Sequence, residues 1–326
     1  MLEKNRRLLS ILFAVAILCT AASGQQRSLD AEDEGAAGQG PRGRVRTVTI
    51  PITIREKGSR AQQEIMAVGE FTVREDGDAQ KILSVRDIGN APLSVAILIQ
   101  DDVVPSIGNE IKAMAEFIRR LPRGSRVMVG YIRTGSLQVR QKFTTDLERA
   151  ASALRVPIGS SAIAPFNPFL EIREGLKRFE GLPAGRRAML VVSDGLDISR
   201  GLDSSIPGQS IDLERAIKEA QRNSVAVYSF YAPTVTLAAS SNALLTSNAL
   251  GSLEKLADET GGRAYFQGTN APVSFDPFLR DLGLSFTRQK ALTYLSTHPN
   301  KGFHRIEVKS GMPNIEIDHP AGYTTR

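Results

Sequence analysis

The sequence has few of the residues that support redox, metal–thiolate or nucleotide chemistry. Its 326 residues include one cysteine, three histidines and no tryptophan. A single cysteine excludes a disulfide framework, a zinc site built from cysteines and an iron–sulfur cluster. The phosphate-binding pattern GxxxxGK[S/T] does not occur, so nucleotide binding has no support. Lysine and arginine exceed aspartate and glutamate by 41 to 35, an excess too small and too scattered to predict nucleic-acid binding.

The first 24 residues have the three-part pattern of a secretory signal peptide. Three cationic residues lie among the first seven, an apolar run covers residues 8–22, and small residues follow at 22–24. We therefore expect an exported chain, periplasmic or extracellular, with a membrane contact only if this segment (1–24) stays uncleaved. Residues 25–46 are rich in glycine, alanine and charge and have no apolar period, which is typical of a flexible linker.

Two stretches of β character flank the middle of the chain. In residues 47–90, valine and isoleucine alternate with polar residues at 48–54, and an Asp-Gly turn signal follows at 76–77. Residues 289–326 have the same β-like pattern, with apolar-rich runs separated by proline and glycine. Each stretch is too small to bury a core alone, so we expect the two to pair in a small β-sandwich.

The segment between them, residues 91–288, alternates apolar strands with amphipathic helices. Positions 93–99 and 188–192 are nearly continuous apolar runs, as expected for strands covered on both faces. Apolar residues recur at spacings of three and four at 107–121, and a Thr-x-x-Glu capping box opens another helix at 145. This order predicts an α/β domain with a doubly wound, mostly parallel sheet.

Carboxylates gather where ligands bind in such a sheet, outside the carboxyl ends of its strands. Asp101 and Asp102 follow the first apolar strand, and Asp194 follows the second. Oxygen ligands of this kind suit Mg²⁺ or Mn²⁺. The same residues can instead have structural roles. Asp101 and Asp102 can lie in a solvated loop that caps the next helix, and Asp194 can be a turn carboxylate that accepts backbone hydrogen bonds.

Five short stretches resemble the von Willebrand factor A-like domain, and most closely the bacterial secreted group of VWFA-related domain proteins. They are FTVREDG at 71–77, PLSV at 92–95, VVSDG at 191–195, LADETGG at 256–262 and HPAGY at 319–323. Their order and spacing carry the match, which spans residues 45–323. The resemblance implies an A-like α/β domain that serves in adhesion and protein–protein interaction and is not an enzyme.

The resemblance also implies a metal-ion-dependent adhesion site, but this chain departs from the family's motif. The family has Asp-x-Ser-x-Ser after its first strand, whereas here Gln100 stands at the aspartate position, with Asp102 and Val104 at the serine positions. Moving the alignment by one residue places Asp101 first and again leaves no serine. Asp194 matches the family's last aspartate. We therefore predict a degenerate site, with Asp101, Asp102 and Asp194 as candidate ligands for Mg²⁺ or Mn²⁺.

An unidentified protein partner is expected at the same edge of the sheet. Residues 233–248 are uncharged and partly apolar, and we interpret them as a long loop beside the aspartates. The predicted contact residues come from this loop and from the loops that follow the strands: Gln100, Ser161, Phe166, Asn167, Asp197, Leu237, Leu244 and Leu245.

Three alternatives stay open on the sequence. The chain can bind its partner without metal, or it can be a structural envelope component in which loop substitutions change only stability. A hydrolase is disfavoured because all three histidines, His298, His304 and His319, lie in the C-terminal β stretch and no GxSxG elbow occurs. His304 and His319 share parity with apolar residues of their strands, where a zinc-binding pair competes with two partly buried, hydrogen-bonded side chains.

Overall fold

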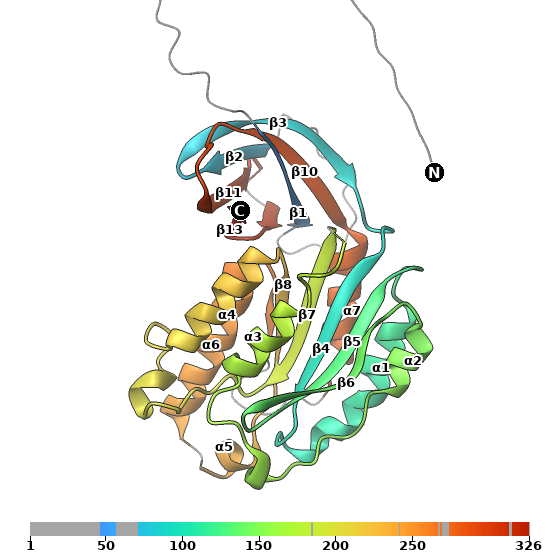
Figure 1. Cartoon of the computed structure of the whole chain (residues 1–326), viewed down its shortest axis with the longest axis vertical. Helices are drawn as coiled ribbons and strands as arrows, with labels where there is room; N and C mark the ends of the chain where they lie inside the picture. Colours follow the sequence, from blue (N-terminus) through green and yellow to red (C-terminus); the bar gives the residue numbers. More distant parts are fainter. Residues whose placement is uncertain are drawn as a thin grey trace, which may run out of the picture. The chain divides into compact units, whose positions relative to one another are not determined.

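The structure is a computed structural model that describes residues 46–56, 71–183, 185–240, 242–266, 268, 274–312 and 315–325 (Figure 1). All of them belong to one compact unit, Gly43–Arg326. The predicted signal peptide, 1–24, and the predicted linker, 25–46, lie outside the described residues apart from Arg46, which begins the first strand. In these described ranges, no helix is both long and apolar enough to cross a membrane.

Six strands form the mostly parallel sheet that the sequence predicts for the middle of the chain. They are β4 (Leu93–Gln100), β5 (Arg126–Arg133), β6 (Ser136–Thr144), β7 (Arg186–Ser193), β8 (Ala226–Tyr231) and β9 (Ala264–Tyr265). Their order is β6-β5-β4-β7-β8-β9, and every neighbouring pair is parallel except β5 and β6. Every residue of β4 is buried, as its continuous apolar sequence predicts for a strand covered on both faces.

Helices cover both faces of this sheet (Figure 1). One layer contains α1 (Ile111–Arg119), α2 (Leu147–Ser152) and α7 (Asp276–Thr287), and the other contains α3 (Phe169–Lys177), α4 (Ile211–Arg222) and α6 (Ala243–Thr260). Alternate residues of β4 reach the two layers: Val95 and Ile97 pack into the first, and Ala96 and Leu98 into the second. The sequence therefore predicts the doubly wound class of this part correctly.

Residues 233–248 do not form the long loop that we expected. They contain α5 (Val235–Ser240) and the first turns of α6. The side chain of Asn242 caps α6 by accepting hydrogen bonds from the backbone N–H groups of Leu244 and Leu245. An uncharged helix gives little contrast between its faces, which is why the sequence pattern did not show it.

Two further local predictions are corrected. The helix expected at 107–121 begins as the 3-10 turn η2 (Pro105–Glu110) and becomes α-helical only at Ile111. Turns of this kind are frequent at helix N-termini, and Pro105 fits the first turn because its missing N–H would have no partner there. The capping box expected at Thr145 is replaced by a cap from Asp146, whose carboxylate accepts from the backbone N–H of Arg149. A short aspartate at this position satisfies the same unpaired helix donors as a threonine.

The two β stretches form one curled antiparallel sheet of seven strands instead of the predicted sandwich of two sheets. Its strands are β1 (Arg46–Glu56), β2 (Phe71–Glu75), β3 (Asp78–Asp87), β10 (Gln289–Ser296), β11 (Gly302–Ser310), β12 (Ile315–Asp318) and β13 (Gly322–Thr325). The order is β12-β1-β10-β3-β2-β11-β13, so strands from both ends of the chain interleave as expected. Because β12 also contacts β11, the sheet curls round its own apolar core.

Arg186, the first residue of β7, connects the two sheets. Its buried guanidinium donates to Gln289 Oε1 at 2.6 Å and to the carbonyl oxygen of Phe286 at 2.6 Å. It also donates to the carbonyl oxygens of Gly89 and Ala91, at 3.0 and 2.7 Å. These acceptors lie on the two connections between the sheets, one before β4 and one at the start of β10. Burial lowers the pKa of Arg186 to about 10, which still leaves the side chain charged at neutral pH.

We expect Arg186→Met to lower the free energy of unfolding by roughly 3 kcal/mol, because several buried oxygens lose their donor together. Urea unfolding followed by circular dichroism measures this change. Arg123→Met is the control, since Arg123 is exposed and its loss should change the free energy of unfolding by less than about 0.5 kcal/mol. Equal effects of the two substitutions would contradict the connecting role of Arg186.

Candidate functional site

The parallel pairing of β4 with β7 brings the predicted site residues together at one edge of the sheet. Gln100, the last residue of β4, is buried, and its Oε1 accepts a hydrogen bond from Ser193 Oγ and a longer one, 3.3 Å, from the backbone N–H of Asp194. Ser193 Oγ also accepts from the backbone N–H of Gly195, at 3.0 Å. Gln100 therefore joins the ends of two strands through neutral hydrogen bonds and is not exposed to a partner.

Asp101 is fully occupied by two arginines and by the backbone N–H of Ile158, which donates to Oδ1 at 3.0 Å. Its Oδ2 accepts from Arg133 Nε at 2.6 Å and from Arg155 Nη2 at 2.6 Å, while Oδ1 accepts from Arg155 Nη1 at 2.7 Å. The Arg155 guanidinium also lies 4.0 Å above the ring of Tyr131. Burial raises the pKa of Asp101, but the hydrogen bonds from Arg155 and Arg133 outweigh it and hold the pKa below its ordinary value. Asp101 is thus a paired anion that stabilises the loop after β4. Because both of its oxygens are already used, the prediction of Asp101 as a metal ligand is wrong for this structure.

The pKa values of Asp102 and Asp194 are raised, whereas that of Asp101 is lowered. Both are buried, with 1% and 4% exposure, and Asp102 Oδ1 has no hydrogen-bond partner. Asp194 Oδ1 accepts from the backbone N–H of Leu196 at 3.1 Å. Burial first, and then the charge of Asp102, raise the pKa of Asp194 to about 7, and burial also raises the pKa of Asp102. Two buried carboxyl groups with neutral partners can share a proton or hold a cation.

The segment that begins α5 covers this pair of aspartates. The backbone N–H of Val104 donates to the carbonyl oxygen of Pro233 at 3.0 Å, and that of Val235 donates to the carbonyl oxygen of Asp102 at 3.2 Å. Between them, Thr234 forms a bridge with Val103. The Thr234 side chain is also hydrogen-bonded to Asp194, where it lowers the pKa of that group against the effect of burial. Sequence reasoning missed Thr234, because only the fold brings it beside the aspartates.

The residues present fit a hard divalent cation. Asp102 supplies an unpaired buried carboxylate oxygen, Asp194 a second carboxylate, and Thr234 a neutral hydroxyl. Both nearby hydroxyls accept from a backbone N–H, Ser193 from Gly195 and Thr234 from Leu237. Thr234 is the better candidate because its hydroxyl is hydrogen-bonded to the Asp194 carboxylate, whereas that of Ser193 donates to Gln100. Oxygen donors with two carboxylates are the set that Mg²⁺ and Mn²⁺ prefer.

Besides Gln100, three of the predicted contact residues, Asn167, Asp197 and Leu237, are buried, and Leu245 is half-buried. Asn167 is buried and donates to Asp212 Oδ2 at 2.9 Å. Asp197 is also buried, and its carboxylate accepts from the hydroxyls of two serines in the loops before α4. Leu237 belongs to a small apolar cluster, and Leu245 packs against that cluster. Their contacts in this structure are with the protein itself.

Three of the predicted contact residues are exposed, and two of them belong to an apolar rim at the carboxyl edge. Phe166 and Leu244 are 65% and 70% exposed, and Ser161, the first residue of the 3-10 turn η3 (Ser161–Ile163), is exposed as well. Three exposed apolar residues that the sequence analysis did not select lie in the loop between β7 and α4: Ile198, Leu202 and Ile206. We call Phe166, Ile198, Leu202, Ile206 and Leu244 the apolar rim.

Comparisons with known proteins leave the family of this chain open. No family model and no curated protein matches it. Among solved structures, it is similar to the conserved hypothetical protein BatB from Bacteroides thetaiotaomicron, with 12% identity, a TM-score of 0.40, and coverage of 60% of this chain and 98% of that chain. An aerotolerance-related membrane protein from Bacteroides fragilis has the same TM-score and coverage at 9% identity. The human COPII-coat protein Sec24c matches 72% of this chain and 44% of that chain, with a TM-score of 0.38 and 12% identity. Likenesses this distant carry no functional argument, so the site is interpreted from its own geometry.

The raised pKa of Asp194 predicts how the stability of the metal-free protein depends on pH. The carboxyl group ionises near 3.8 when unperturbed and near 7 in the folded protein, so folding takes up a proton between these values. The contribution of Asp194 to the free energy of unfolding is therefore largest at acid pH and is lost as the pH rises through about 7. Asp194→Asn should unfold at a higher urea concentration than wild type near pH 8 and at a similar one near pH 4, in chelator.

Asp101→Asn is the matched control, because its effect has the opposite sign. The pKa of Asp101 is lowered in the folded protein, so its stabilising contribution is present at neutral pH and is lost in acid. We expect Asp101→Asn to unfold at a lower urea concentration than wild type near pH 8. Identical pH profiles for wild type and Asp194→Asn would contradict the buried-pair interpretation.

Proposed function

We propose that this chain is an exported, non-enzymatic protein that binds another protein through the apolar rim. The observation that carries the proposal is the concentration of exposed apolar side chains at the carboxyl edge of the parallel sheet. Single exposed apolar residues are ordinary on protein surfaces, whereas a group of them at one edge is typical of an interaction site. Export rests on the signal-like sequence of residues 1–24.

Hydrogen bonds between the loops support the rim as one surface. The backbone N–H of Ile198 donates to the carbonyl oxygen of Phe166 at 2.8 Å, which places these two residues side by side. The turn η4 (Leu202–Ser205) is joined to α6 because Asn248 Nδ2 donates to Ser205 Oγ at 2.9 Å. Leu202 therefore lies close to the helix that carries Leu244.

A divalent cation at Asp102, Asp194 and Thr234 is the second part of the proposal. The cation would neutralise the carboxylate pair and hold the segment at Pro233 against the loop after β4. Since both carboxylates are almost completely buried, the cation would shape the contact surface from beneath and would not bind an acidic group of the partner directly. In the metal-free alternative, the partner binds to the same apolar rim, and a proton shared by Asp102 and Asp194 takes the place of the cation.

The hydrolase alternative has less support than the interaction module. Ser193, the serine nearest the aspartates, donates its hydroxyl hydrogen to Gln100 and not to a base. The three histidines belong to the curled sheet: His304 lies within β11, His298 follows β10, and His319 follows β12. A structural envelope role is a third alternative. It differs from the interaction module and from the hydrolase because it needs no contact at the apolar rim.

The cation proposal predicts saturable binding of Mg²⁺ or Mn²⁺ to the chelator-stripped full chain near pH 8, measured by isothermal titration calorimetry. Asp194→Ala should weaken binding at least about tenfold, because it removes one of two carboxylate ligands. Asp203→Ala is the control, since Asp203 is an exposed aspartate of the neighbouring turn. An absence of saturable heat at millimolar metal would leave the aspartates as a proton-sharing pair and the rim as a metal-free surface.

The rim proposal predicts that a photo-crosslinking amino acid at position 244 captures a second protein in cells that make this chain. The same probe at Leu83, an exposed leucine of β3, should give no such product. Phe166→Ser combined with Leu244→Ser should reduce capture from a probe at position 202 by roughly tenfold or more, because central apolar contacts dominate protein interfaces. Equal capture from positions 244 and 83, or capture that survives the double substitution, would contradict the proposal.

A further inference from the structure

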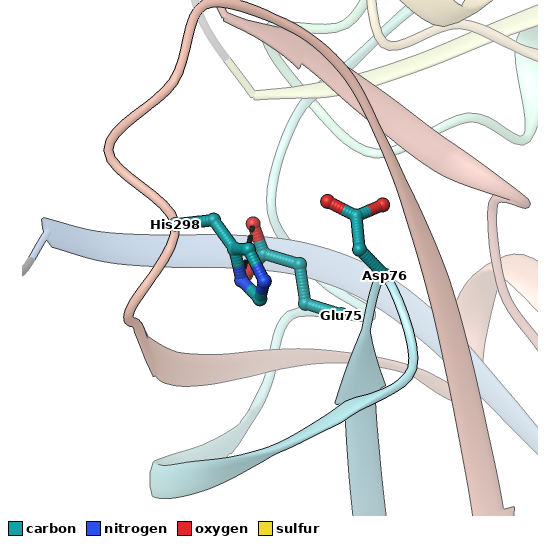
Figure 2. Close-up of side chains that lie close together, drawn as sticks. All are labelled: Glu75, Asp76 and His298. Atoms are coloured by element: carbon teal, nitrogen blue, oxygen red, sulfur yellow. Dashed lines mark ion pairs between the residues drawn. The ribbon is translucent and has the colours of Figure 1, made fainter.

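A second group of ligand-type side chains lies in the curled sheet, far along the chain from the aspartates. Glu75 ends β2, Asp76 begins the turn to β3, and His298 follows β10 (Figure 2). One ligand atom from each of these three residues lies within 4.8 Å of the others. The neighbouring strand β11, which pairs with β2, adds His304, whose Nδ1 is 2.7 Å from Asp76 Oδ2 and 3.5 Å from Glu75 Oε1.

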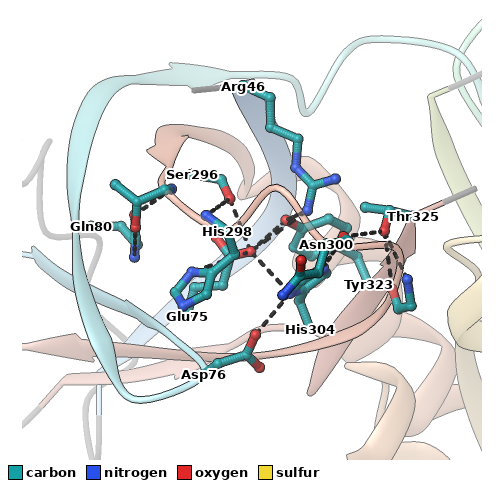
Figure 3. A network of polar contacts seen from close by, with 12 residues as sticks. Arg46, Glu75, Asp76, Gln80, Ser296, His298, Asn300, His304, Tyr323 and Thr325 are labelled. Carbon is teal, nitrogen blue, oxygen red and sulfur yellow. Dashed lines mark hydrogen bonds and ion pairs between the residues drawn. The ribbon is translucent and has the colours of Figure 1, made fainter. Parts of the chain in front are cut away.

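Glu75 holds an unpaired oxygen in this group. The side chain has no solvent exposure, and its Oε1 accepts from Tyr323 Oη at 2.6 Å and from Ser296 Oγ at 3.0 Å (Figure 3). The guanidinium of Arg46 is 3.8 Å from the same Oε1 and donates to Tyr323 Oη. Oε2 is buried and has no hydrogen-bond partner. A buried carboxylate oxygen left unpaired is costly. The buried hydroxyl of Tyr294 interacts with the same Glu75 side chain, so Oε2 is open to that hydroxyl or to a further ligand.

Both histidines have an outer partner on Nε2. His304 Nε2 is 2.9 Å from the carbonyl oxygen of Asn300, which can only accept, so Nε2 carries a hydrogen. His298 Nε2 is 3.2 Å from Asp78 Oδ2, and its Nδ1 is buried without a hydrogen-bond partner. Nδ1 of both histidines faces Glu75 and Asp76. In the metal-free protein His304 Nδ1 donates to Asp76 Oδ2 at 2.7 Å, and a bound metal ion would take the place of that hydrogen. An outer carboxylate or carbonyl on the second nitrogen is the usual surrounding of a metal-bound histidine.

We propose that Glu75, Asp76, His298 and His304 bind a divalent transition metal ion of the Zn²⁺ type. Two imidazole nitrogens with two carboxylates favour Zn²⁺ over Mg²⁺, whereas the oxygen-only set at Asp102 and Asp194 has the reverse preference. Tetrahedral Zn²⁺ places its ligand atoms about 3.3 to 3.6 Å apart. The nitrogen–oxygen distances of 2.7, 3.5 and 4.0 Å bracket this spacing. His304 lies outside the set of three residues whose ligand atoms are within 4.8 Å of one another, so its ring must shift toward that of His298 to complete the site.

The four residues also differ in exposure in a way that allows a metal to enter. The side chains of Glu75 and His304 are 0% and 5% exposed, whereas those of His298 and Asp76 are 20% and 35% exposed. A bound ion would tie the turn after β2 to β11 and to the connection between β10 and β11.

His319 provides an internal control in the same sheet. Its Nε2 accepts from the backbone N–H of Val308 at 3.3 Å, and its Nδ1 faces the carbonyl oxygen of Pro320 at 2.9 Å. Both ring nitrogens are therefore used within the protein. His304 instead lies beside His298, with ring centroids 6.0 Å apart. The pairing of His304 with His319 that the sequence allowed is thus replaced by one between His304 and His298.

The test is titration of Zn²⁺ and Co²⁺ into the chelator-stripped full chain. We expect one equivalent of Zn²⁺ by calorimetry, and visible Co²⁺ absorption of the strength that four-coordinate sites give. His298→Ala and His304→Ala should each weaken Zn²⁺ binding at least about 100-fold and abolish the Co²⁺ band, because each removes a ligand. His319→Ala and Asp194→Ala should leave both signals unchanged, which separates this site from the aspartate pair and from the proposed function.

A readout based on stability covers the case in which His304→Ala does not fold. Zn²⁺ should raise the urea midpoint of wild type and of His319→Ala, because the ion binds only the folded chain, and should not raise that of His298→Ala, a partly exposed position. Three results would overturn the proposal: no saturable Zn²⁺ binding to wild type, unchanged affinity in His298→Ala, or a Zn²⁺-dependent midpoint that survives His298→Ala.

Discussion

The burial of one arginine without a carboxylate partner holds the two sheets in a single unit. Arg186 directs its donors to backbone and amide oxygens at both crossings between the curled sheet and the parallel sheet. The buried guanidinium needs all of these neutral acceptors together. If one of them moves away, a buried N–H group is left without a hydrogen-bond partner, which costs free energy. The same strand, β7, ends at Ser193 beside Asp194. The connection between the sheets and the aspartate pair are therefore positioned by opposite ends of one buried strand.

Three neighbouring aspartates show how burial and partners, rather than residue type, decide a carboxylate's role. Asp101 meets two arginines and is a paired anion, whereas Asp194 meets neutral donors and another acid, so its pKa rises to about 7. Asp197 accepts from serine hydroxyls and orders a loop. In the curled sheet, Glu75 has one oxygen satisfied and one without a partner, as Asp102 has an unpaired oxygen at the edge of the parallel sheet. At the two places where a cation is proposed, such an oxygen lies beside other ligand-type side chains, which is more than a count of acidic residues shows.

The sequence predicts most of the architecture because its main patterns are local. The buried run of β4 and the Asp-Gly turn at 76–77 depend only on neighbouring residues, and both are found. The partners of Asp101 could not be predicted, because Arg133 and Arg155 lie 32 and 54 positions away and approach only in the fold. The same holds for Thr234 beside Asp194. The curled form of the second sheet was missed because period-2 alternation shows which face is buried but not whether one sheet or two enclose it.

The interleaving of the chain's two ends in the curled sheet also constrains the order in which the protein can fold. Strand β1 pairs with β10, so Arg46 meets Ser296 only after nearly all of the chain has been made. Contacts between positions so distant in sequence are slow to form. Until the last forty or so residues emerge, β1, β2 and β3 have open hydrogen-bonding edges and an apolar face without cover. The first strand of this sheet therefore reaches its paired state only together with β10, so the two sequence-distant halves of the sheet must fold in one concerted step.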